Sequence, residues 1–243
     1  MAKSSQKSVL ITGGARRIGA EIAVKLAGEG FDIALHYNRS RKEALKVVKA
    51  VQNLGRQCHL FQCDLGNEKD ANQLVKAVVK KFPGLMLLVN NASLFEKSSI
   101  KQASLKSWNQ HMNINFKAPF ILIQGFAKAC RKGSVINILD TNVSKDETQH
   151  TTYLLSKKAL TELTRMAAVE LAPNIRVNGI APGFILAPEG AKSGYLKRLK
   201  EKIPLRKKGE PAYIADTVMF LVQNPYITGE IIFVDGGEHL SKK

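Results

Sequence analysis

Short apolar runs alternate along the chain with segments in which apolar residues recur every three or four positions. The run at 9–11 is followed by Ile18, Ile22 and Leu26, which share one helical face before Gly30. Continuous apolar runs are typical of strands buried on both faces, and the wider spacing is typical of helices with one buried face. The same alternation predicts further strands at 31–37, 57–62, 85–89, 135–139, 175–180 and 230–234. It predicts further helices at about 44–54, 67–79, 104–130, 151–172 and 212–222.

A repeated strand–helix order with apolar strands indicates one parallel sheet that helices cover on both faces. The predicted fold class is therefore α/β, a single doubly wound sheet formed by one domain over 1–243. The 44% hydrophobic content is enough for a substantial core and argues against a disordered chain. No apolar run reaches the ~18 residues that a membrane helix needs. We therefore expect no membrane partner.

Charge and cysteine content narrow the setting of the protein. The 37 lysines and arginines exceed the 20 aspartates and glutamates, which gives a formal charge of +17. Such a charge is compatible with a nucleic acid, with small anions or with a well-solvated surface. The three cysteines are odd in number and form no C-x-x-C pair, which predicts reduced thiols and a cytoplasmic location.

A glycine-containing turn follows the first predicted strand and precedes the first predicted helix. It runs from Thr12 to Gly19. Glycines allow the backbone to approach a phosphate closely, and the free N–H groups at the start of the helix favour an anion there. Because ligands of doubly wound sheets bind at the carboxyl ends of the strands, this turn is a candidate dinucleotide site. Its predicted cofactor-binding residues are Gly13, Arg16, Arg17, Ile18 and Gly19.

The end of the second predicted strand distinguishes between the two dinucleotides. A site for NAD needs an acid there for the ribose 2′-hydroxyl, whereas a site for NADP accommodates a 2′-phosphate with basic residues. The strand ends without an acid, and Asp32 lies at its opposite end. We therefore predict NADP(H), although Arg39 is also compatible with an ordinary solvated loop cation. The residues assigned to this part of the site are Tyr37, Asn38, Arg39 and Ser40, together with Arg17.

Tyr153 and Lys157 are four residues apart in a predicted helix and so share one face. A lysine ammonium beside a phenol favours the phenolate, so we expect Lys157 to lower the pKa of Tyr153. Such a tyrosine donates a proton near neutral pH. The pair alone is not specific, because this spacing occurs by chance in many helices.

The motifs together resemble the short-chain dehydrogenase/reductase family over the whole chain, which implies a Rossmann fold. The resemblance rests on the glycine turn, Asp64-Leu65, Asn90-Asn91-Ala92, Asn115, Tyr153 with Lys157, Pro182-Gly183, and the final Val234-Asp235-Gly236-Gly237. It implies that Asp64 flanks the adenine, that Asn91 and Ala92 contact the adenosine ribose, and that Lys157 contacts the nicotinamide ribose. It implies that Asn115 holds a water of the proton relay, that Leu65, Pro182 and Gly183 border the cofactor, and that the protein is a homotetramer whose main interface is made by the long helices.

Three departures from the usual family pattern point to one branch. Arg17 and Ser93 stand where the family usually has glycine, and Asp140, thirteen residues before Tyr153, stands where it usually has serine. A carboxylate there would repel a developing oxyanion but suits a nitrogen-rich ring. These changes, with Phe95 in the segment Asn91-Ala92-Ser93-Leu94-Phe95, resemble the pteridine reductases and dihydromonapterin reductases.

The resemblance implies NADPH-dependent reduction of a C=N bond in a pterin or dihydrofolate-type substrate. Phe95 and the nicotinamide would sandwich the substrate ring, while Ser93 and Arg17 bond its polar edge. Asp140, Tyr153 and Lys157, with Asn115, would deliver the proton. The alternative is a 3-oxoacyl-carrier-protein reductase or a general carbonyl reductase, against which Asp140 argues. A non-catalytic NADP(H) sensor is a further alternative, against which the intact Tyr153, Lys157 and Asn115 argue.

The remaining features concern the surroundings of this site. We expect a substrate lid at about 184–208, within which eight basic residues and one acid give the segment 192–208 a net charge of +7. No zinc-finger spacing, RNA-binding aromatic motif or basic heptad helix is present, so we expect no nucleic-acid partner. Cys58, His59 and Cys63 have no second ligand pair, so we expect no metal. His150 either lines the pocket or is structural.

Overall fold

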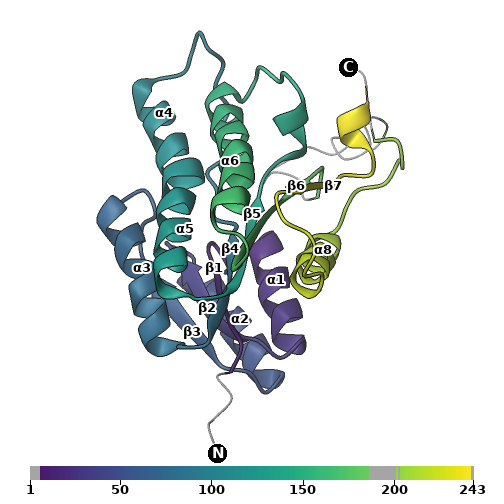
Figure 1. Cartoon of the computed structure of the whole chain (residues 1–243). Helices are drawn as coiled ribbons and strands as arrows, with labels where there is room; N and C mark the ends of the chain where they lie inside the picture. The colour runs from purple at the N-terminus through teal and green to yellow at the C-terminus, as the bar shows by residue number, and fades with distance from the viewer. Residues whose placement is uncertain (1–5, 186–200, 202, 242–243) are drawn as a thin grey trace, which may run out of the picture.

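The computed structural model describes residues 6–185, 201 and 203–241. Its centre is a seven-stranded sheet in the order β3-β2-β1-β4-β5-β6-β7, in which every neighbouring pair of strands is parallel (Figure 1). The chain reverses its direction of progress across the sheet between β1 and β4, as in doubly wound folds. The predicted class is confirmed: the protein has a Rossmann-type α/β fold.

Every strand predicted from the sequence is present, and so is every predicted helix except the continuous one at 104–130, with small shifts at the ends. The strands are β1 (Ser8–Ile11), β2 (Asp32–Tyr37), β3 (Cys58–Gln62), β4 (Leu85–Asn90), β5 (Gly133–Ile138), β6 (Ile175–Pro182) and β7 (Ile231–Val234). The helices are α1 (Arg17–Gly28), α2 (Arg41–Asn53), α3 (Glu68–Lys81), α4 (Leu105–Met112), α5 (Ala118–Ala129), α6 (Thr151–Glu170) and α8 (Pro211–Gln223).

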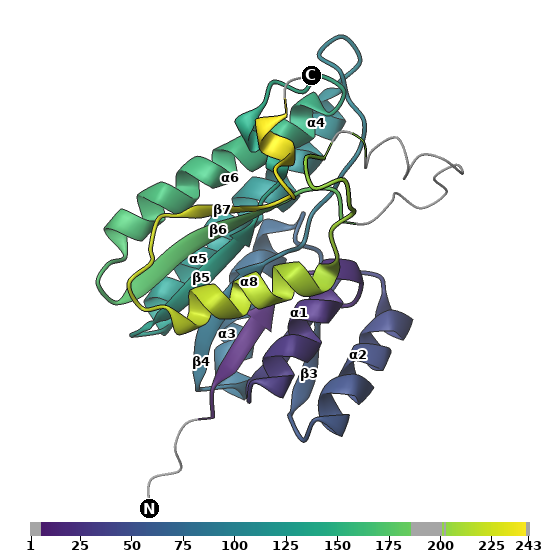
Figure 2. The same cartoon turned by 90° about the vertical axis from the view of Figure 1, so that its right-hand side faces the viewer.

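Two layers of helices enclose the sheet. Helices α1, α2 and α8 lie on one face, and α3, α4, α5 and α6 lie on the other (Figure 2). Successive residues of a strand point to opposite faces, so Val9 and Ile11 pack under α1 while Leu10 packs under α3 and α5. The central strands are accordingly buried at almost every position, which explains their continuous apolar runs.

The predicted long helix at 104–130 is interrupted. A π-helical turn, Asn113–Lys117, separates α4 from α5, and the backbone N–H of Ala118 donates to the carbonyl of Asn113, five residues earlier. Pro119 has no N–H group and cannot donate to the carbonyl of Asn115, four residues before it, so a regular α-helical ladder is not available at this point. The predicted lid at 184–208 lies mostly outside the described residues, which include only 184–185, 201 and 203–208 of it.

Candidate active site

A cleft of about 1960 Å³ runs along the carboxyl ends of the strands in the described part of the chain. Loops after β1, β2, β3, β4, β5 and β6 contribute to its walls, together with residues near the C-terminus. All the site residues predicted from the sequence line it except Asn115, which is fully buried behind it. Those that line it are Gly13, Arg16, Arg17, Ile18, Gly19, Tyr37, Asn38, Arg39, Ser40, Asp64, Leu65, Asn91, Ala92, Ser93, Phe95, Asp140, Tyr153, Lys157, Pro182 and Gly183.

The glycine turn is packed tightly against the end of β4. Gly13 has φ +61°, and a Cβ there would lie 2.9 Å from the Cα of Ala92. A Cβ at Gly19 would lie 2.4 Å from the carbonyl oxygen of Gly13. The Asn91 amide donates to the carbonyls of Thr12 and Gly13 at 2.9 and 3.0 Å. Because α1 has neither a side-chain cap nor an acid in its first turn, its N-terminal N–H groups suit a phosphate.

His36 braces this turn from the neighbouring strand. Its Nδ1 accepts from the N–H of Gly13 at 3.1 Å, and its Nε2 lies 3.2 Å from the carbonyl oxygen of Cys63. Since a carbonyl only accepts, Nε2 carries the proton and the ring is neutral. Burial lowers the pKa of His36 to about 4, which the hydrogen bond to Cys63 and the charge of Asp64 only partly oppose. No motif in the sequence indicated a role for His36.

The end of β2 contains polar side chains without an acid among them. Arg41 donates to the Tyr37 hydroxyl at 3.2 Å, and that hydroxyl donates to Gln62 at 3.2 Å. Ser40 precedes α2 without capping it, so its hydroxyl is not committed to the helix end. Asp32 lies at the opposite end of the strand, where Arg56 donates to it at 2.8 Å. The arrangement therefore offers hydroxyl, guanidinium and backbone donors at the place where the two dinucleotides differ.

Asp140, Tyr153 and Lys157 meet in the middle of the cleft. The Tyr153 hydroxyl donates to Asp140 Oδ2 at 2.7 Å. Asp140 Oδ1 accepts from the backbone and side-chain nitrogens of Asn142 at 2.8 and 2.9 Å, which fixes the plane of the carboxylate. Lys157 Nζ donates to the carbonyl of Ile138 at 2.8 Å and lies 5.9 Å from the centre of the Tyr153 ring. The i, i+4 spacing thus places both side chains on one face of α6.

The expected effect on the tyrosine was wrong in direction. Burial raises the pKa of Tyr153 well above its ordinary value, and the charge of Asp140 and the hydrogen bond to it raise it further. Burial lowers the pKa of Lys157 to about 8, although the charge of Asp140 opposes this. The sequence could not show that a carboxylate lies closer to the phenol than the ammonium does. In this state the phenol stays protonated, which is the form that a proton donor needs.

Asn115 acts behind the cleft. Its Oδ1 accepts from the N–H of Leu94 at 2.8 Å, and its Nδ2 donates to the Leu94 carbonyl at 2.9 Å and to Ser156 Oγ at 3.1 Å. The side-chain amide is therefore committed to tying the loop after β4 to α6. The main-chain carbonyl of Asn115 lacks its α-helical donor, because Pro119 has no N–H, and so offers an acceptor for a water.

An aromatic cluster lines the cleft beside Tyr153. The rings of Phe95 and His150 are stacked, with centroids 4.5 Å apart, and Phe95 meets Tyr153 edge to face at 4.7 Å. Glu147 Oε2 lies 3.1 Å from His150 Nδ1, and all four side chains line the cleft. Phe95 is 54% exposed, so ring surface remains available to a ligand. Of the two readings of His150, the structure supports the pocket-lining one.

Several residues of the site carry no sequence signal that our motif analysis used. Asn142, which orients Asp140, lies two residues beyond it. Thr141 Oγ1 donates to Asp235 at 2.5 Å and so ties the turn after β5 to the C-terminal segment. Glu238 accepts from the N–H of Phe184 at 3.0 Å, and Lys145 donates to the Glu238 carbonyl. These contacts join segments far apart in the chain, which local patterns do not reveal.

Two further observations concern other kinds of site. Within residues 6–185, 201 and 203–241, no group of three or more His, Cys, Asp or Glu side chains is placed to hold a metal ion. In the same residues, no helix is both long and apolar enough to cross a membrane.

Comparisons with known proteins agree with this geometry. A family model described as enoyl-(acyl carrier protein) reductase matches residues 13–239. The 3-oxoacyl-[acyl-carrier-protein] reductase FabG of Staphylococcus epidermidis is 34% identical, and the alignment covers 96% of this chain and 99% of the relative.

Solved structures match over nearly the whole chain. FolM alternative dihydrofolate reductase 1 from Brucella canis, complexed with NADP, superposes with a TM-score of 0.93 at 39% identity and covers 98% of this chain and 96% of its own. A variant of a Serratia marcescens short-chain dehydrogenase/reductase has a TM-score of 0.91 at 30% identity, with 96% and 98% coverage. The chain belongs to the short-chain dehydrogenase/reductase family and is an oxidoreductase that depends on a nicotinamide dinucleotide.

Proposed function

We propose that the protein is an NADPH-dependent pteridine reductase, which adds hydride and a proton across a C=N bond of a dihydropterin or dihydrofolate-type substrate to give the tetrahydro form. The observation that carries the proposal is the carboxylate of Asp140, held at 2.7 Å from the Tyr153 hydroxyl. A carboxylate is a poor partner for the oxyanion that forms in ketone reduction and a good one for the N–H groups of a protonated ring. The FolM likeness at 39% identity supports the same substrate class.

We assign NADP(H) as the cofactor. The glycine turn and the uncapped start of α1 fit a pyrophosphate, and the cradle between Gly13 and Ala92 has no room for a Cβ. Arg17, Arg39 and Ser40 line the same cleft and would bind a 2′-phosphate, and no acid stands at the end of β2 to oppose it. The FolM structures were solved with NADP. When bound, this cofactor supplies the hydride.

The loop after β4 and the glycine turn hold the substrate ring. Phe95 offers an aromatic face, and Ser93 and Arg17 line the same cleft with hydrogen-bond donors for a polar ring edge. Holding two flat rings in register removes much of the entropic cost of bringing the reacting atoms together. His150 stacks on Phe95 and restricts the movement of the Phe95 ring.

The proton reaches the substrate nitrogen from the Asp140–Tyr153 pair. Tyr153 keeps its proton because of its burial and of Asp140, and Lys157 provides the nearby positive charge that favours its release as the substrate nitrogen takes it up. A water on the Asn115 carbonyl would connect Lys157 to solvent and restore the proton. Asn142 keeps the carboxylate of Asp140 facing the tyrosine throughout.

The second candidate is a 3-oxoacyl-carrier-protein reductase, which the 34% identity to FabG favours. The two candidates share the cofactor, Tyr153 and Lys157 and differ in the group beside the substrate atom that is reduced. A hydroxyl donor polarises a ketone, whereas Asp140, if ionised, only accepts. The identity of this one side chain therefore separates the candidates.

Purified protein will be assayed for oxidation of NADPH with dihydrobiopterin, dihydromonapterin, dihydrofolate and a 3-oxoacyl thioester. We expect turnover of at least one pterin or folate and little of the thioester. Asp140→Ser should lower kcat/KM for the pterin by about 100-fold, since a proton-relay group contributes about 10² to 10⁴, and should raise turnover of the thioester.

Asp146→Ser is the matched control, because Asp146 lies in the same loop with a fully exposed side chain. It should change neither rate. Brisk turnover of the thioester by the wild type, with none of any pterin or folate, would reject the proposal.

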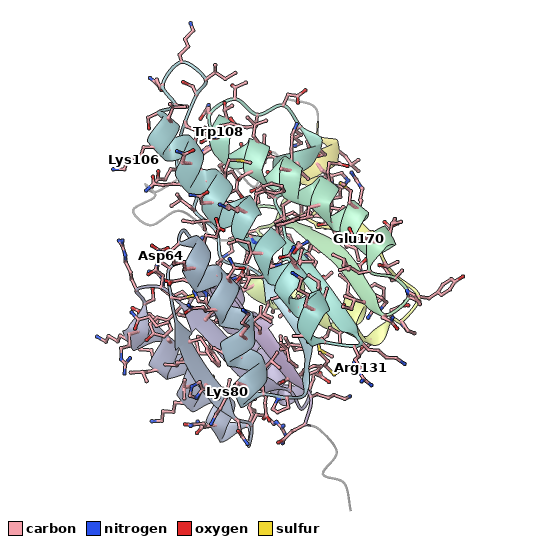
Figure 3. The ribbon with its side chains drawn as sticks, turned by 60° about the vertical axis from the view of Figure 1, so that its left-hand side comes forward. Asp64, Lys80, Lys106, Trp108, Arg131 and Glu170 are labelled. Atoms are coloured by element: carbon pink, nitrogen blue, oxygen red, sulfur yellow. The ribbon has the colours of Figure 1, made fainter. Side chains whose placement is uncertain are left out.

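We also propose that the active form is a homotetramer in the cytoplasm. Helices α4, α5 and α6, which are in view in Figure 3 with Trp108 of α4 labelled, carry exposed apolar side chains. An exposed apolar face of this kind favours burial against a second copy of the chain. The side chains are Leu105, Trp108, Phe120, Leu155, Met166 and Val169. The free thiols of Cys58, Cys63 and Cys130 fit a reducing compartment.

A further inference from the structure

Three buried polar side chains lie where the loop after β4 meets the start of α6. They are Ser98, Thr152 and His111, which are 5%, 2% and 0% exposed. None of them lines the cleft, yet Ser98 lies three residues beyond Phe95, and Thr152 immediately precedes Tyr153. Polar groups buried in such a place cost free energy unless they are paired, so their partners indicate what they do.

The three side chains form one hydrogen-bonded chain. Ser98 Oγ and Thr152 Oγ1 are 2.6 Å apart, and the N–H of Thr152 also donates to Ser98 Oγ at 3.2 Å. Thr152 Oγ1 is 2.9 Å from His111 Nδ1 on α4. The carbonyl of Ser107 is 2.9 Å from the same nitrogen. Thr152 is therefore the central member, bonded to both the loop and α4.

The directions of these bonds follow from the chemistry of the partners. The Ser107 carbonyl only accepts, so His111 Nδ1 carries a proton and the Thr152 hydroxyl accepts from it. Either hydroxyl, that of Thr152 or that of Ser98, can donate to the other. The other ring nitrogen, Nε2, is buried and has no hydrogen-bond partner among the described residues. Burial lowers the pKa of His111, and the charge of His150 lowers it further, while the bond to Ser107 and the charge of Glu96 oppose them. A neutral ring is the form that this arrangement needs.

Backbone hydrogen bonds join the same two segments. The N–H of Ser98 donates to the carbonyl of Gln149 at 2.9 Å, and the N–H of Thr151 donates to the carbonyl of Ser98 at 2.7 Å. Ser98 thus pairs with His150 as an isolated parallel bridge. The side-chain network lies directly under this bridge and fixes its position against α4. Phe95 belongs to the same segment as Ser98, on one side of the bridge. His150 and Tyr153 belong to the segment on the other side.

We propose that Thr152, with Ser98 and His111, is a positioning residue that sets the separation between Phe95 and Tyr153. It acts through the bridge and touches neither substrate nor cofactor. The proposal rests on the proposed function in one respect, that Phe95 contacts the substrate. Phe95, which sets the stacking distance to the substrate ring, lies on one side of the bridge, and Tyr153, which sets the proton-transfer distance, lies on the other. Loosening the bridge therefore moves Phe95 relative to Tyr153. The glycine turn and the end of β2, which hold the phosphates of the proposed cofactor, lie on other loops, so the Kd for NADPH should change much less than KM for the substrate.

The test compares Thr152→Val, Thr152→Ser and Thr164→Val. Valine keeps the shape of threonine without its hydroxyl, and serine keeps the hydroxyl. Thr164 is the matched control: it is buried on the same helix, donates to the Leu160 carbonyl at 2.7 Å and accepts from Asn137 at 2.8 Å, and it does not line the cleft. Ser98→Ala breaks the same link from the loop side and serves if Thr152→Val does not fold.

Thr152→Val should raise KM for the substrate about tenfold, as expected for the loss of one well-placed buried hydrogen bond, with a much smaller change in the Kd for NADPH. Thr152→Ser should restore KM to within about twofold. Thr164→Val should lower Tm and leave KM as it is. If Thr152→Val and Thr164→Val shift KM equally, or if serine does not rescue, the network is only structural and the proposal is wrong.

Hydrogen–deuterium exchange provides a readout that does not depend on the substrate. In Thr152→Val the amides of Ser98 and Thr151 should exchange faster, and in Thr164→Val they should not. Exchange at wild-type rates in Thr152→Val would overturn the proposal. If the wild type turns over a 3-oxoacyl thioester and no pterin, the proposed function fails, and KM is then measured with the thioester while the exchange result stands on its own.

Discussion

At the residue scale, the behaviour of single side chains departs most from what their sequence neighbours suggest. Tyr153 was expected to become more acidic because Lys157 is four residues away. The structure raises its pKa instead, because Asp140 lies 2.7 Å away and the ring is buried. Asp140 itself was located by its thirteen-residue offset from Tyr153, since both belong to a recurring motif. Burial and the nearest partner decide a pKa, and neither is visible in spacing.

The effect of burial on a pKa can be tested at His36 by measuring stability in acid. Its pKa in the folded protein is about 4, against an ordinary value of 6.5, so the unfolded chain binds this proton more tightly. The contribution of the neutral His36 ring to the free energy of unfolding is complete above pH 6.5 and is lost as the pH falls toward 4. The full loss is about 3 kcal/mol, from about 1.4 kcal/mol per pKa unit.

Urea unfolding between pH 7 and pH 4.5 measures this effect. His36→Asn, which does not titrate in this range, should make the free energy of unfolding less dependent on pH by up to one proton. His59→Gln removes an exposed imidazole from β3 and should leave the dependence unchanged. Equal pH dependence in the wild type and His36→Asn would show that the imidazole is not held in its neutral form.

At the element scale, strands and helices followed closely from the hydrophobic pattern. Buried parallel strands must be apolar on both faces, and helices on a sheet must be apolar on one, so the pattern reflects the fold directly. The predicted helix at 67–79 begins at Asn67, which caps α3: its side chain accepts from the N–H of Lys69 at 2.9 Å. The π-helical turn at Asn113–Lys117 was missed, because Pro119 changes the hydrogen bonding while the apolar spacing continues through it.

The close contact between the glycine turn and α1 predicts a severe effect of one methyl group. In Gly19→Ala the new Cβ would lie 2.4 Å from the Gly13 carbonyl and 2.6 Å from Asn91 Nδ2, so the turn or α1 must move. We expect NADPH binding to weaken at least 100-fold, because the phosphate-binding N–H groups move with it. Isothermal titration with NADPH measures this.

Gly28→Ala is the control, since a Cβ at that position of the same helix meets nothing within 4 Å. It should bind NADPH as the wild type does. Wild-type affinity in Gly19→Ala would mean that the turn does not contact the cofactor.

At the scale of the whole molecule, the charge of +17 is the feature that the structure explains least directly. Arg16, Arg17 and Arg39 line the cleft, which fits a small anion. Of the eight bases in 192–208, only Arg206, Lys207 and Lys208 lie in the described residues. The fold was predictable because the strand–helix unit repeats along the chain. The contacts of Asp235 and Glu238 with residues distant in the sequence were not predictable.

The proposed assembly is also tested at this scale. Met166→Glu with Val169→Glu places two carboxylates on α6, where the side chains are 68% and 82% exposed. If this face is an interface, burying the charges is costly and the tetramer should dissociate to a smaller species. Light scattering after size-exclusion chromatography measures the mass.

Leu54→Glu, at the end of α2 on the opposite side of the sheet, is the control and should keep the wild-type mass. A wild-type mass equal to one chain would refute the assembly outright.

The backbone conformation of Arg17 affects the stability of the whole molecule as well as the proposed site. Its φ of +56° lies in the left-handed region, which costs a residue other than glycine about 1 kcal/mol or more. The family pattern has glycine here, so a consensus-based stabilisation of this protein would choose glycine and relieve the strain. On the proposed role of its guanidinium, that choice would also remove a donor to both cofactor and substrate. Selection for activity therefore favours arginine at position 17, whereas selection for stability alone favours glycine. Substitutions that stabilise the protein without loss of activity must be made at other positions.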